Sequence, residues 1–260
     1  MSTINVNGIS VNYLVEGSGP WLTLSHSLAC DLTMWDELTA ALKKHFTVLR
    51  YDTRGHGASS APEGAYSFEQ LTTDVLALLY ALKIERTHFV GLSMGGMIGQ
   101  HLALAAPQQI GRLVLANTSS RMPPEAIALW EERFAQARTQ GTASLADATL
   151  GRWFTPPFRA THPQLMARVA ALIAATPVAG YVGCGEAIRR LDITERLGDI
   201  LRPTLVIVGA DDPGTPPAAS EVIARAIPGA RLEIIPAASH LSCLEQPEVF
   251  NRLVADFLGS

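Results

Sequence analysis

The chain has 260 residues, and 48% of them are hydrophobic, which is enough apolar material to bury a substantial core. Its 20 basic and 24 acidic residues give a formal charge of −4 and form no long like-charge run, so nucleic acid is not an expected partner. No segment approaches the roughly 20 apolar residues of a membrane-spanning helix, and the first ten residues lack the features of a secretory signal.

The first predicted elements form a hairpin, because Asn7-Gly8 readily supplies the positive φ angles of a tight turn between strands 4–7 and 9–15. Short β-rich runs then alternate with longer helical patterns. This alternation predicts an α/β protein with a mainly parallel sheet covered by helices on both faces. The four further strands expected in this first part of the chain span 21–25, 46–52, 88–92 and 112–117.

The alternation stops after Asn117, and the next convincing strand is 204–208, much farther along the chain than a simple crossover requires. Helical patterns at 125–138 and 164–175 occupy the interval. We therefore expect a core domain of residues 1–120 and 197–260, with a helical cap, residues 121–196, inserted into it. After strand 204–208, the predicted core elements are a helix at 217–226, a strand at 231–235 and a helix at 247–258.

The strongest chemical signal is Gly91-Leu92-Ser93-Met94-Gly95, a G-x-S-x-G sequence between a predicted strand and a predicted helix. A serine on such a sharp turn is held in strained backbone geometry, and only glycine avoids steric conflict two residues to either side. The pattern predicts that Ser93 is a catalytic nucleophile. A phosphate-binding loop is disfavoured because no Lys-Ser or Lys-Thr follows and G-x-G-x-x-G is absent.

A serine nucleophile needs a histidine base, and the histidine needs an acidic residue to orient it. His240 follows the strand 231–235 in a loop that can overhang the carboxyl edge of the sheet. The acid is expected between serine and histidine in the chain, where Asp211 and Asp212 compete after strand 204–208. We prefer Asp212, because Asp211 is nearer the strand end and better suited to supporting the turn.

The oxyanion of an acyl-transfer intermediate would be stabilised by the backbone N–H groups of Leu28 and Met94. Leu28 lies in Ser25-His26-Ser27-Leu28, directly after the first core parallel strand. We interpret His26 as a buried, hydrogen-bonded residue that supports this loop. The turn Asp52–Gly57 is interpreted as structural.

The three cysteines, Cys30, Cys184 and Cys243, are far apart and odd in number, which favours reduced thiols and a cytoplasmic location. No pair of cysteines or histidines has the spacing of a zinc site, so we predict no metal.

These residues resemble the α/β-hydrolase superfamily along essentially the whole chain. The segments that carry this resemblance are Gly91–Gly95, Asp52–Ser59, Gly209–Pro216 and the loop of His240. A narrower similarity is to 3-oxoadipate enol-lactonases of aromatic catabolism. It is carried by Ser25–Leu28 with Asp31 and Met34-Trp35, by Gly91–Gln100 and by Gly180–Cys184.

The narrower resemblance implies hydrolysis of the enol-lactone of 3-oxoadipate in the β-ketoadipate pathway, through an acyl-enzyme and without a cofactor. The expected partner is a small anionic lactone. In the predicted cap helix, Trp130 and Arg133 share a face and could present an indole to the ring and a guanidinium to the carboxylate. Simpler interpretations place Trp130 in the core and pair Arg133 with a glutamate. Alternative functions are a carboxylesterase or other lactonase, a C–C bond hydrolase, and a non-enzymatic binding protein.

Overall fold

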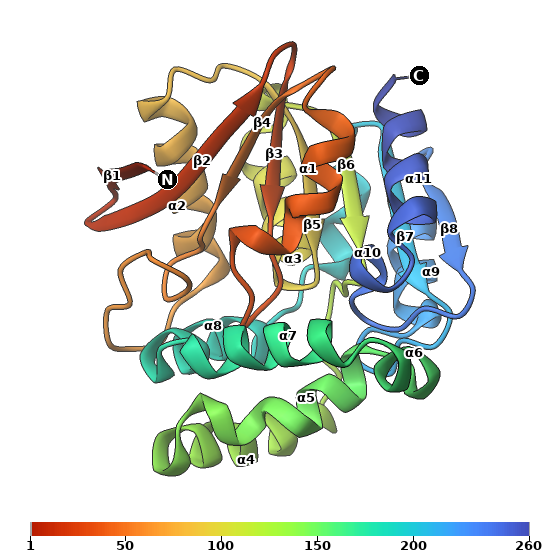
Figure 1. Cartoon of the computed structure of the whole chain (residues 1–260). Helices are drawn as coiled ribbons and strands as arrows, with labels where there is room; N and C mark the ends of the chain where they lie inside the picture. The colour runs from red at the N-terminus through yellow and green to blue at the C-terminus, as the bar shows by residue number, and fades with distance from the viewer. Residues whose placement is uncertain (1, 260) are drawn as a thin grey trace.

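The computed structural model describes residues 2–259, which contain one eight-stranded sheet with the strand order β1-β2-β4-β3-β5-β6-β7-β8 (Figure 1). Strands β1 and β2 pair antiparallel, and β2 pairs antiparallel with β4; the remaining neighbours are parallel. The expected mixed edge on a mainly parallel sheet is therefore confirmed. The strands are β1 (Ser2–Val6), β2 (Ile9–Gly17), β3 (Trp21–Ser25), β4 (Thr47–Tyr51), β5 (Thr87–Leu92), β6 (Ile110–Ala116), β7 (Thr204–Gly209) and β8 (Arg231–Ile235).

The hairpin turn between β1 and β2 has the predicted geometry. Asn7 and Gly8 have φ angles of 47° and 76°, so both adopt the left-handed conformation that a tight two-residue turn requires. The ends of both strands lie within two residues of the expected positions. Val6 pairs with Ile9 next to the turn, which sets the register of the hairpin. The turn sequence, rather than the hydrophobic pattern, determines this register.

Helices cover the sheet on both faces, as the alternation predicts. Helices α2 and α3 pack together on one face, whereas α1 and α11 pack together on the other (Figure 1). The core helices are α1 (Asp36–Leu42), α2 (Phe68–Ala81), α3 (Met94–Ala105), α9 (Pro217–Ala226), α10 (Ser242–Glu245) and α11 (Pro247–Gly259). Short 3₁₀ turns occur at η1 (Leu32–Trp35), η2 (Pro107–Gln109), η3 (Thr142–Leu145) and η4 (Thr194–Asp199).

Five helices between β6 and β7 lie beyond the end of the sheet toward which the arrows of β3, β6 and β8 point (Figure 1). An isolated bridge between Arg121 and Asp192 joins the two ends of this segment. All five helices fall within the predicted insertion, residues 121–196, and we call them the cap. They are α4 (Ala126–Gln140), α5 (Ala146–Trp153), α6 (Pro156–Thr161), α7 (Pro163–Ala175) and α8 (Val178–Arg189).

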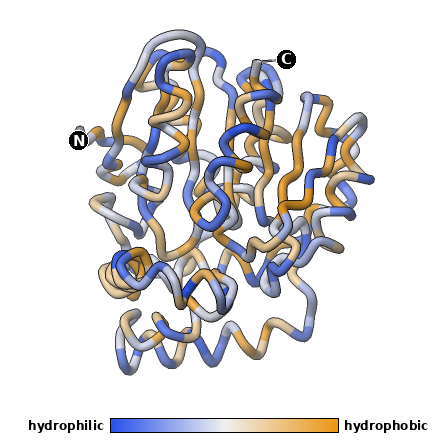
Figure 2. The backbone as a smooth tube through the Cα atoms, turned by 45° about the vertical axis from the view of Figure 1, so that its right-hand side comes forward, coloured by the Kyte–Doolittle hydropathy of each residue, from blue (hydrophilic) through white to orange (hydrophobic). Residues whose placement is uncertain are grey.

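The core is continuous from the sheet into the cap. The central strands are hydrophobic along most of their length (Figure 2), which is the pattern of strands that are buried on both faces. On α4, Trp130, Phe134 and Ala137 are buried as their helical spacing predicts. Ile127, at the same helical spacing in the first turn of α4, is 39% exposed.

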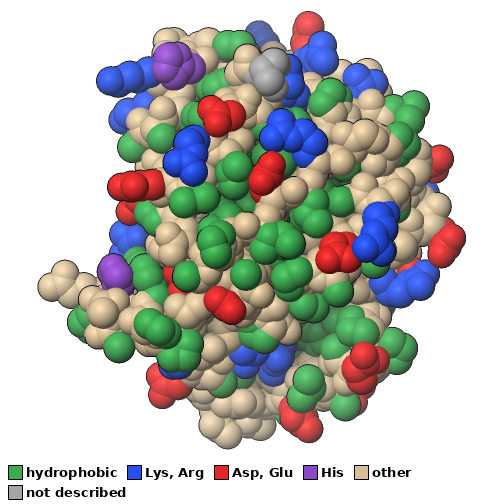
Figure 3. All heavy atoms as spheres, turned by 90° about the vertical axis from the view of Figure 1, so that its right-hand side faces the viewer, with side chains coloured by type: hydrophobic (Ala, Val, Ile, Leu, Met, Phe, Trp, Pro, Cys, Tyr) green, Lys and Arg blue, Asp and Glu red, His purple; other side chains and the backbone are tan. Residues whose placement is uncertain are grey.

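The outer surface mixes charge and apolar groups. On the face that contains β8 and α11, acidic and basic side chains are interspersed with hydrophobic ones (Figure 3). Among the described residues, no single helix has both the length and the apolarity to cross a membrane. Helices α7 and α8 reach that length and apolarity only when taken together, and they meet at a bend of 91°.

Candidate active site

Ser93 occupies the turn between β5 and α3, with φ = 56° and ψ = −115°. A Cβ atom on Gly91 would lie 2.1 Å from the carbonyl oxygen of Gly95, and one on Gly95 would lie 2.1 Å from that of Ser25. Only glycine fits at both positions, which is the steric reason for the G-x-S-x-G spacing. The expected strained turn is therefore present.

Neighbouring backbone holds this turn in place. The Ser93 N–H donates to the Ala116 carbonyl at the end of β6 (2.9 Å), and the Thr118 hydroxyl donates to the Ser93 carbonyl (2.8 Å). Because both backbone groups of Ser93 are bonded, the left-handed conformation is fixed by its surroundings. The side chain lies at the carboxyl edge of the sheet and retains 8% exposure.

Asp212 and His240 are brought together from two neighbouring strands. Asp212 follows β7 and His240 follows β8, and His240 Nδ1 lies 2.8 Å from Asp212 Oδ2. A carboxylate can only accept, so Nδ1 carries the proton and Nε2 keeps a lone pair. This tautomer is the one in which a histidine can take a proton from a serine hydroxyl.

Asp212 is held as an anion by donors on both of its oxygens. Oδ2 accepts from His240, Asn117 Nδ2 (2.9 Å) and Thr215 Oγ1 (2.7 Å). Oδ1 accepts from the N–H groups of Gly214 (2.8 Å) and Thr215 (3.0 Å). Burial alone would raise the pKa of Asp212, but His240 and these hydrogen bonds lower it below its ordinary value.

The competing Asp211 has a different environment. Its side chain is exposed, whereas its N–H donates to Ala238 and its carbonyl accepts from Ser239. Asp211 therefore supports the loop through its backbone. The preference for Asp212 as the partner of His240 agrees with this geometry.

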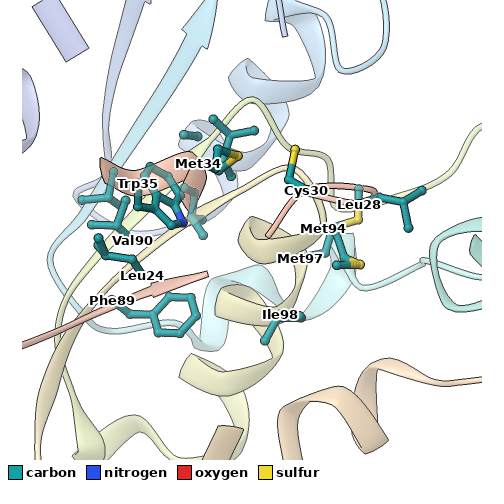
Figure 4. Packing of buried hydrophobic residues seen from close by; sticks show 14 of the residues in the cluster. Leu24, Leu28, Cys30, Met34, Trp35, Phe89, Val90, Met94, Met97 and Ile98 are labelled. Carbon is teal, nitrogen blue, oxygen red and sulfur yellow. The ribbon is translucent and has the colours of Figure 1, made fainter. Parts of the chain in front are cut away.

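The two predicted oxyanion donors have free N–H groups. Within residues 2–259, neither Leu28 N–H nor Met94 N–H donates a hydrogen bond to the protein. Ala29 follows Leu28 with φ = 57°, and its own N–H donates to His56 Nε2 (3.0 Å), so the loop is fixed one residue beyond the donor. The side chains of Leu28 and Met94 belong to the same packed cluster (Figure 4).

His26 and the turn after β4 support this loop, as expected. Thr53 N–H donates to His26 Nε2 (2.9 Å), so His26 Nδ1 carries a proton and donates to the Ser27 carbonyl (2.7 Å). Asp52 accepts from the N–H groups of Leu32 and Ala58. Burial lowers the pKa of His26, which keeps it neutral and available as an acceptor.

Beyond Gly214 and Thr215, two residues that the sequence did not single out contact the pair. Asn117, directly after β6, donates to Asp212 and to the Ser239 carbonyl, and it accepts from Ser242. Trp153, from cap helix α5, stacks on His240 with ring centroids 6.2 Å apart. The position of Asn117 at a strand end was a usable signal; nothing in the sequence distinguishes Trp153 from other apolar cap residues.

Trp130 and Arg133 lie together on α4. Trp130 is 7% exposed and packs against Phe134, as a core residue does. The guanidinium of Arg133 lies 5.2 Å from the centre of the Trp130 ring. Arg133 makes no ion pair within the described residues, so its simpler interpretation as the partner of a glutamate is wrong.

Within the described residues, the cysteines and acidic side chains form no metal centre. Cys30, Cys184 and Cys243 are free and buried, and burial raises the pKa of each thiol. Across residues 2–259, no group of three or more histidine, cysteine or acidic side chains is arranged to hold a metal ion. The polar groups at the carboxyl edge are instead arranged for proton transfer and anion stabilisation.

Comparison with known proteins agrees with this geometry. Residues 20–247 match the family model described as the alpha/beta hydrolase fold. The chain belongs to this family, and the predicted fold class is confirmed.

Within the family, the chain is similar to enol-lactonases along its whole length, which confirms the predicted resemblance. It is 39% identical to 3-oxoadipate enol-lactonase 2 of Acinetobacter baylyi, over 97% of this chain and 94% of that protein. The enol-lactonase structure from Burkholderia xenovorans LB400 superposes with a TM-score of 0.96 and 44% identity, covering 100% of both chains. A thermophilic esterase from Thermogutta terrifontis, 28% identical, has a TM-score of 0.94 and covers 99% of this chain and 98% of that chain.

Proposed function

We propose that the protein hydrolyses the enol-lactone of 3-oxoadipate to 3-oxoadipate, with Ser93 as nucleophile, His240 as base and Asp212 as the orienting acid. The observation that carries the chemistry is the strained Ser93 turn beside two unpartnered N–H groups, with the Asp212–His240 pair on neighbouring strand ends. Similarity over the full chain to two enol-lactonases supports the substrate.

In the proposed reaction, Ser93 Oγ attacks the lactone carbonyl while His240 Nε2 takes the hydroxyl proton. The carbonyl oxygen becomes an oxyanion, which the N–H groups of Leu28 and Met94 stabilise. Collapse of this intermediate breaks the ring C–O bond and expels an enolate oxygen. The enolate takes up the proton that His240 holds and becomes a ketone, which leaves the other end of the substrate as an ester on Ser93 and returns His240 to its neutral form.

Water completes the cycle. His240 takes a proton from water, whose oxygen attacks the ester carbonyl, and the proton then passes to Ser93 Oγ as the acid is released. The enol leaving group is better than an ordinary alkoxide, because its negative charge is shared with carbon. Asp212 stabilises the protonated His240 in both halves of the reaction.

A carboxylesterase is the second candidate, favoured by the similarity to the Thermogutta esterase. The two functions share Ser93 and differ in the preferred leaving group. A panel of the enol-lactone, p-nitrophenyl esters, saturated lactones and vinylogous diketones separates them. We expect the kcat/KM for the enol-lactone to exceed that for every other substrate by about 100-fold. An equal or higher kcat/KM for simple esters would contradict the lactonase assignment.

The cytoplasm is the proposed location, since it keeps thiols reduced and all three cysteines are free. Fractionation of cells that express the natural protein tests this. Recovery in the periplasmic or secreted fraction would contradict it.

A further inference from the structure

Two arginines of the cap carry charge that no acidic side chain balances. Arg133 on α4 and Arg152 on α5 are both part-buried, and within residues 2–259 neither forms an ion pair. Arg152 donates only to Thr149 Oγ1 (3.0 Å), and Arg133 lies over Trp130. By contrast, Arg189 of the same cap pairs with two glutamates. Because an unpaired guanidinium is costly to remove from water, an anion from outside the chain is the expected partner.

Arg133 lies where α4 packs against α8. Its guanidinium lies over Trp130, and a Cβ on Gly185, one turn along α8 from Tyr181, would lie 3.2 Å from the Trp130 ring. Burial lowers the pKa of Arg152, and the positive charge of Arg133 lowers it further. Burial raises the pKa of the Tyr181 hydroxyl, whereas both arginines oppose that rise. The positive charges of Arg133 on α4 and Arg152 on α5 therefore both act on Tyr181 of α8.

The Tyr181 hydroxyl also lacks a partner. The residue is 5% exposed, yet its hydroxyl makes no hydrogen bond within the part of the chain that the structure describes. It is not among the fully enclosed unpartnered atoms, so it faces open space. Buried hydroxyl groups are normally hydrogen-bonded. This one is available to a bound ligand.

The segment of α5 that carries Arg152 contacts the loop of the catalytic base. Arg152 directly precedes Trp153, whose indole stacks on His240. The carbonyl of Arg152 also accepts from Ser239 Oγ (2.9 Å), one residue before His240. A ligand whose reacting carbonyl is at Ser93 can therefore extend a side arm toward these cap residues.

We propose that Arg133, Arg152 and Tyr181 form a carboxylate-binding site that selects substrates with a negatively charged side arm. This inference rests on the proposed function for the placement of the reacting carbonyl, and it extends recognition beyond Arg133 to Arg152 and Tyr181. A guanidinium can bind a carboxylate through two parallel hydrogen bonds, and the tyrosine hydroxyl adds a third donor. Neutral esters of the same length gain none of these contacts.

The test compares mono-p-nitrophenyl glutarate with p-nitrophenyl pentanoate, which has a similar chain length and no charge. We expect Arg152→Met to lower kcat/KM for the anionic ester about 10- to 100-fold, mainly through KM, with little effect on the neutral ester. Tyr181→Phe should lower it about 2- to 10-fold, with the same selectivity. Arg168→Met, an exposed arginine of α7, is the matched control and should leave the ratio unchanged.

Inhibition of the wild-type enzyme provides a test that does not depend on the folding of any variant. Glutarate should inhibit competitively at least ten times more strongly than glutaramide, which has the same length and no charge. Equal inhibition by the two compounds, or equal losses on both esters in folded Arg152→Met, would overturn the site. The two proposals can fail separately. If the wild type does not hydrolyse the enol-lactone but prefers the anionic ester, and Arg152→Met loses that preference, the proposed function fails and the carboxylate site stands.

Discussion

The indole of Trp153 lies over the imidazole of His240, with an interplanar angle of 27° and a centroid separation of 6.2 Å. Trp153 ends α5, and its carbonyl accepts from the N–H of Leu241. The cap therefore contacts the proposed base through both a side chain and the backbone. Since Asp212 fixes only one edge of the His240 ring, Trp153 restrains its face.

We predict that Trp153→Leu lowers kcat/KM about 2- to 12-fold, because the contact between two aromatic rings is lost while the hydrogen bond to Asp212 remains. Steady-state kinetics on the enol-lactone measures the effect. Trp21→Leu, at the start of β3 and the opposite end of the sheet, is the control and should leave kcat/KM unchanged. Unchanged activity in folded Trp153→Leu would show that the ring does not restrain His240.

For the acid, Asp212→Asn should lower kcat by about 10⁴-fold, because an amide cannot stabilise protonated His240 and favours the wrong tautomer. Asp211→Asn should change kcat by less than about threefold, since its side chain is exposed and its loop contacts use the backbone. The two variants carry the same chemical change at adjacent positions. A larger loss at Asp211 would reverse the assignment.

Stability should fall in acid because two histidines are buried in neutral form. Burial, aided by the His26 ring 5.3 Å away, which would repel a second protonated imidazole, lowers the pKa of His56 from 6.5 to about 3. Between these values the unfolded chain binds a proton that the folded chain excludes, so the free energy of unfolding falls as the pH falls through this window. The lowered pKa of His26 acts in the same direction.

The expected slope from His56 is about 1.4 kcal/mol per pH unit below pH 6.5. Urea unfolding of the wild type and His56→Gln at pH 7.5, 6.0 and 5.0 measures it. The variant should start less stable, because Ala29 loses its acceptor, but should lose less stability on acidification. His45→Gln, at an exposed position, should keep the wild-type slope. A His56→Gln slope equal to the wild type would refute this explanation.

Gly95→Ala should lower the free energy of unfolding by more than about 3 kcal/mol or prevent folding, because the new Cβ would lie 2.1 Å from the Ser25 carbonyl oxygen. Gly151→Ala on α5 is the matched control. Its Cβ would have nothing closer than 4.0 Å, and alanine favours helix, so the control should gain up to about 1 kcal/mol. Denaturant melts of both variants decide this, and a wild-type midpoint for Gly95→Ala would contradict the close approach.

The strand alternation and the Ser93 turn could be predicted because both depend on local sequence. Apolar runs bounded by turn residues predict buried parallel strands, and the steric need for Gly91 and Gly95 is contained within five residues. The element ends differ from the prediction by one or two residues in most cases. Hydrophobic periodicity does not determine where a helix or strand frays.

The sequence does not predict helix α8, because Gly180, Gly183 and Gly185 disfavour a helix in isolation. In the structure, a Cβ on Gly180 would lie 1.9 Å from the Gly55 carbonyl oxygen, and one on Gly185 would lie 2.4 Å from Phe134. Tertiary packing therefore overrides helix propensity here. The other contacts of the cap cannot be predicted from the sequence for a similar reason. They join residues far apart in the chain, and only the fold brings them together.

Ser93→Ala and His240→Ala should each lower kcat by several orders of magnitude and leave the fold intact, because the three residues act as one unit. The remaining activity should be similar in the two single variants and in the double variant, since each loss disables the same step. Circular dichroism confirms the fold, and kinetics on the enol-lactone measures the losses. Additive losses in the double variant would mean that Ser93 and His240 act independently.

The most direct test of the central claim is labelling of the wild-type protein with a fluorophosphonate, followed by intact mass measurement and peptide mapping. Ser93 should take up one equivalent, because its hydroxyl is activated by His240 and the phosphonyl oxygen can accept from the free N–H groups of Leu28 and Met94. Labelling should disappear in Ser93→Ala and become far slower in His240→Ala. An unlabelled Ser93 in folded, wild-type protein would contradict its assignment as the nucleophile.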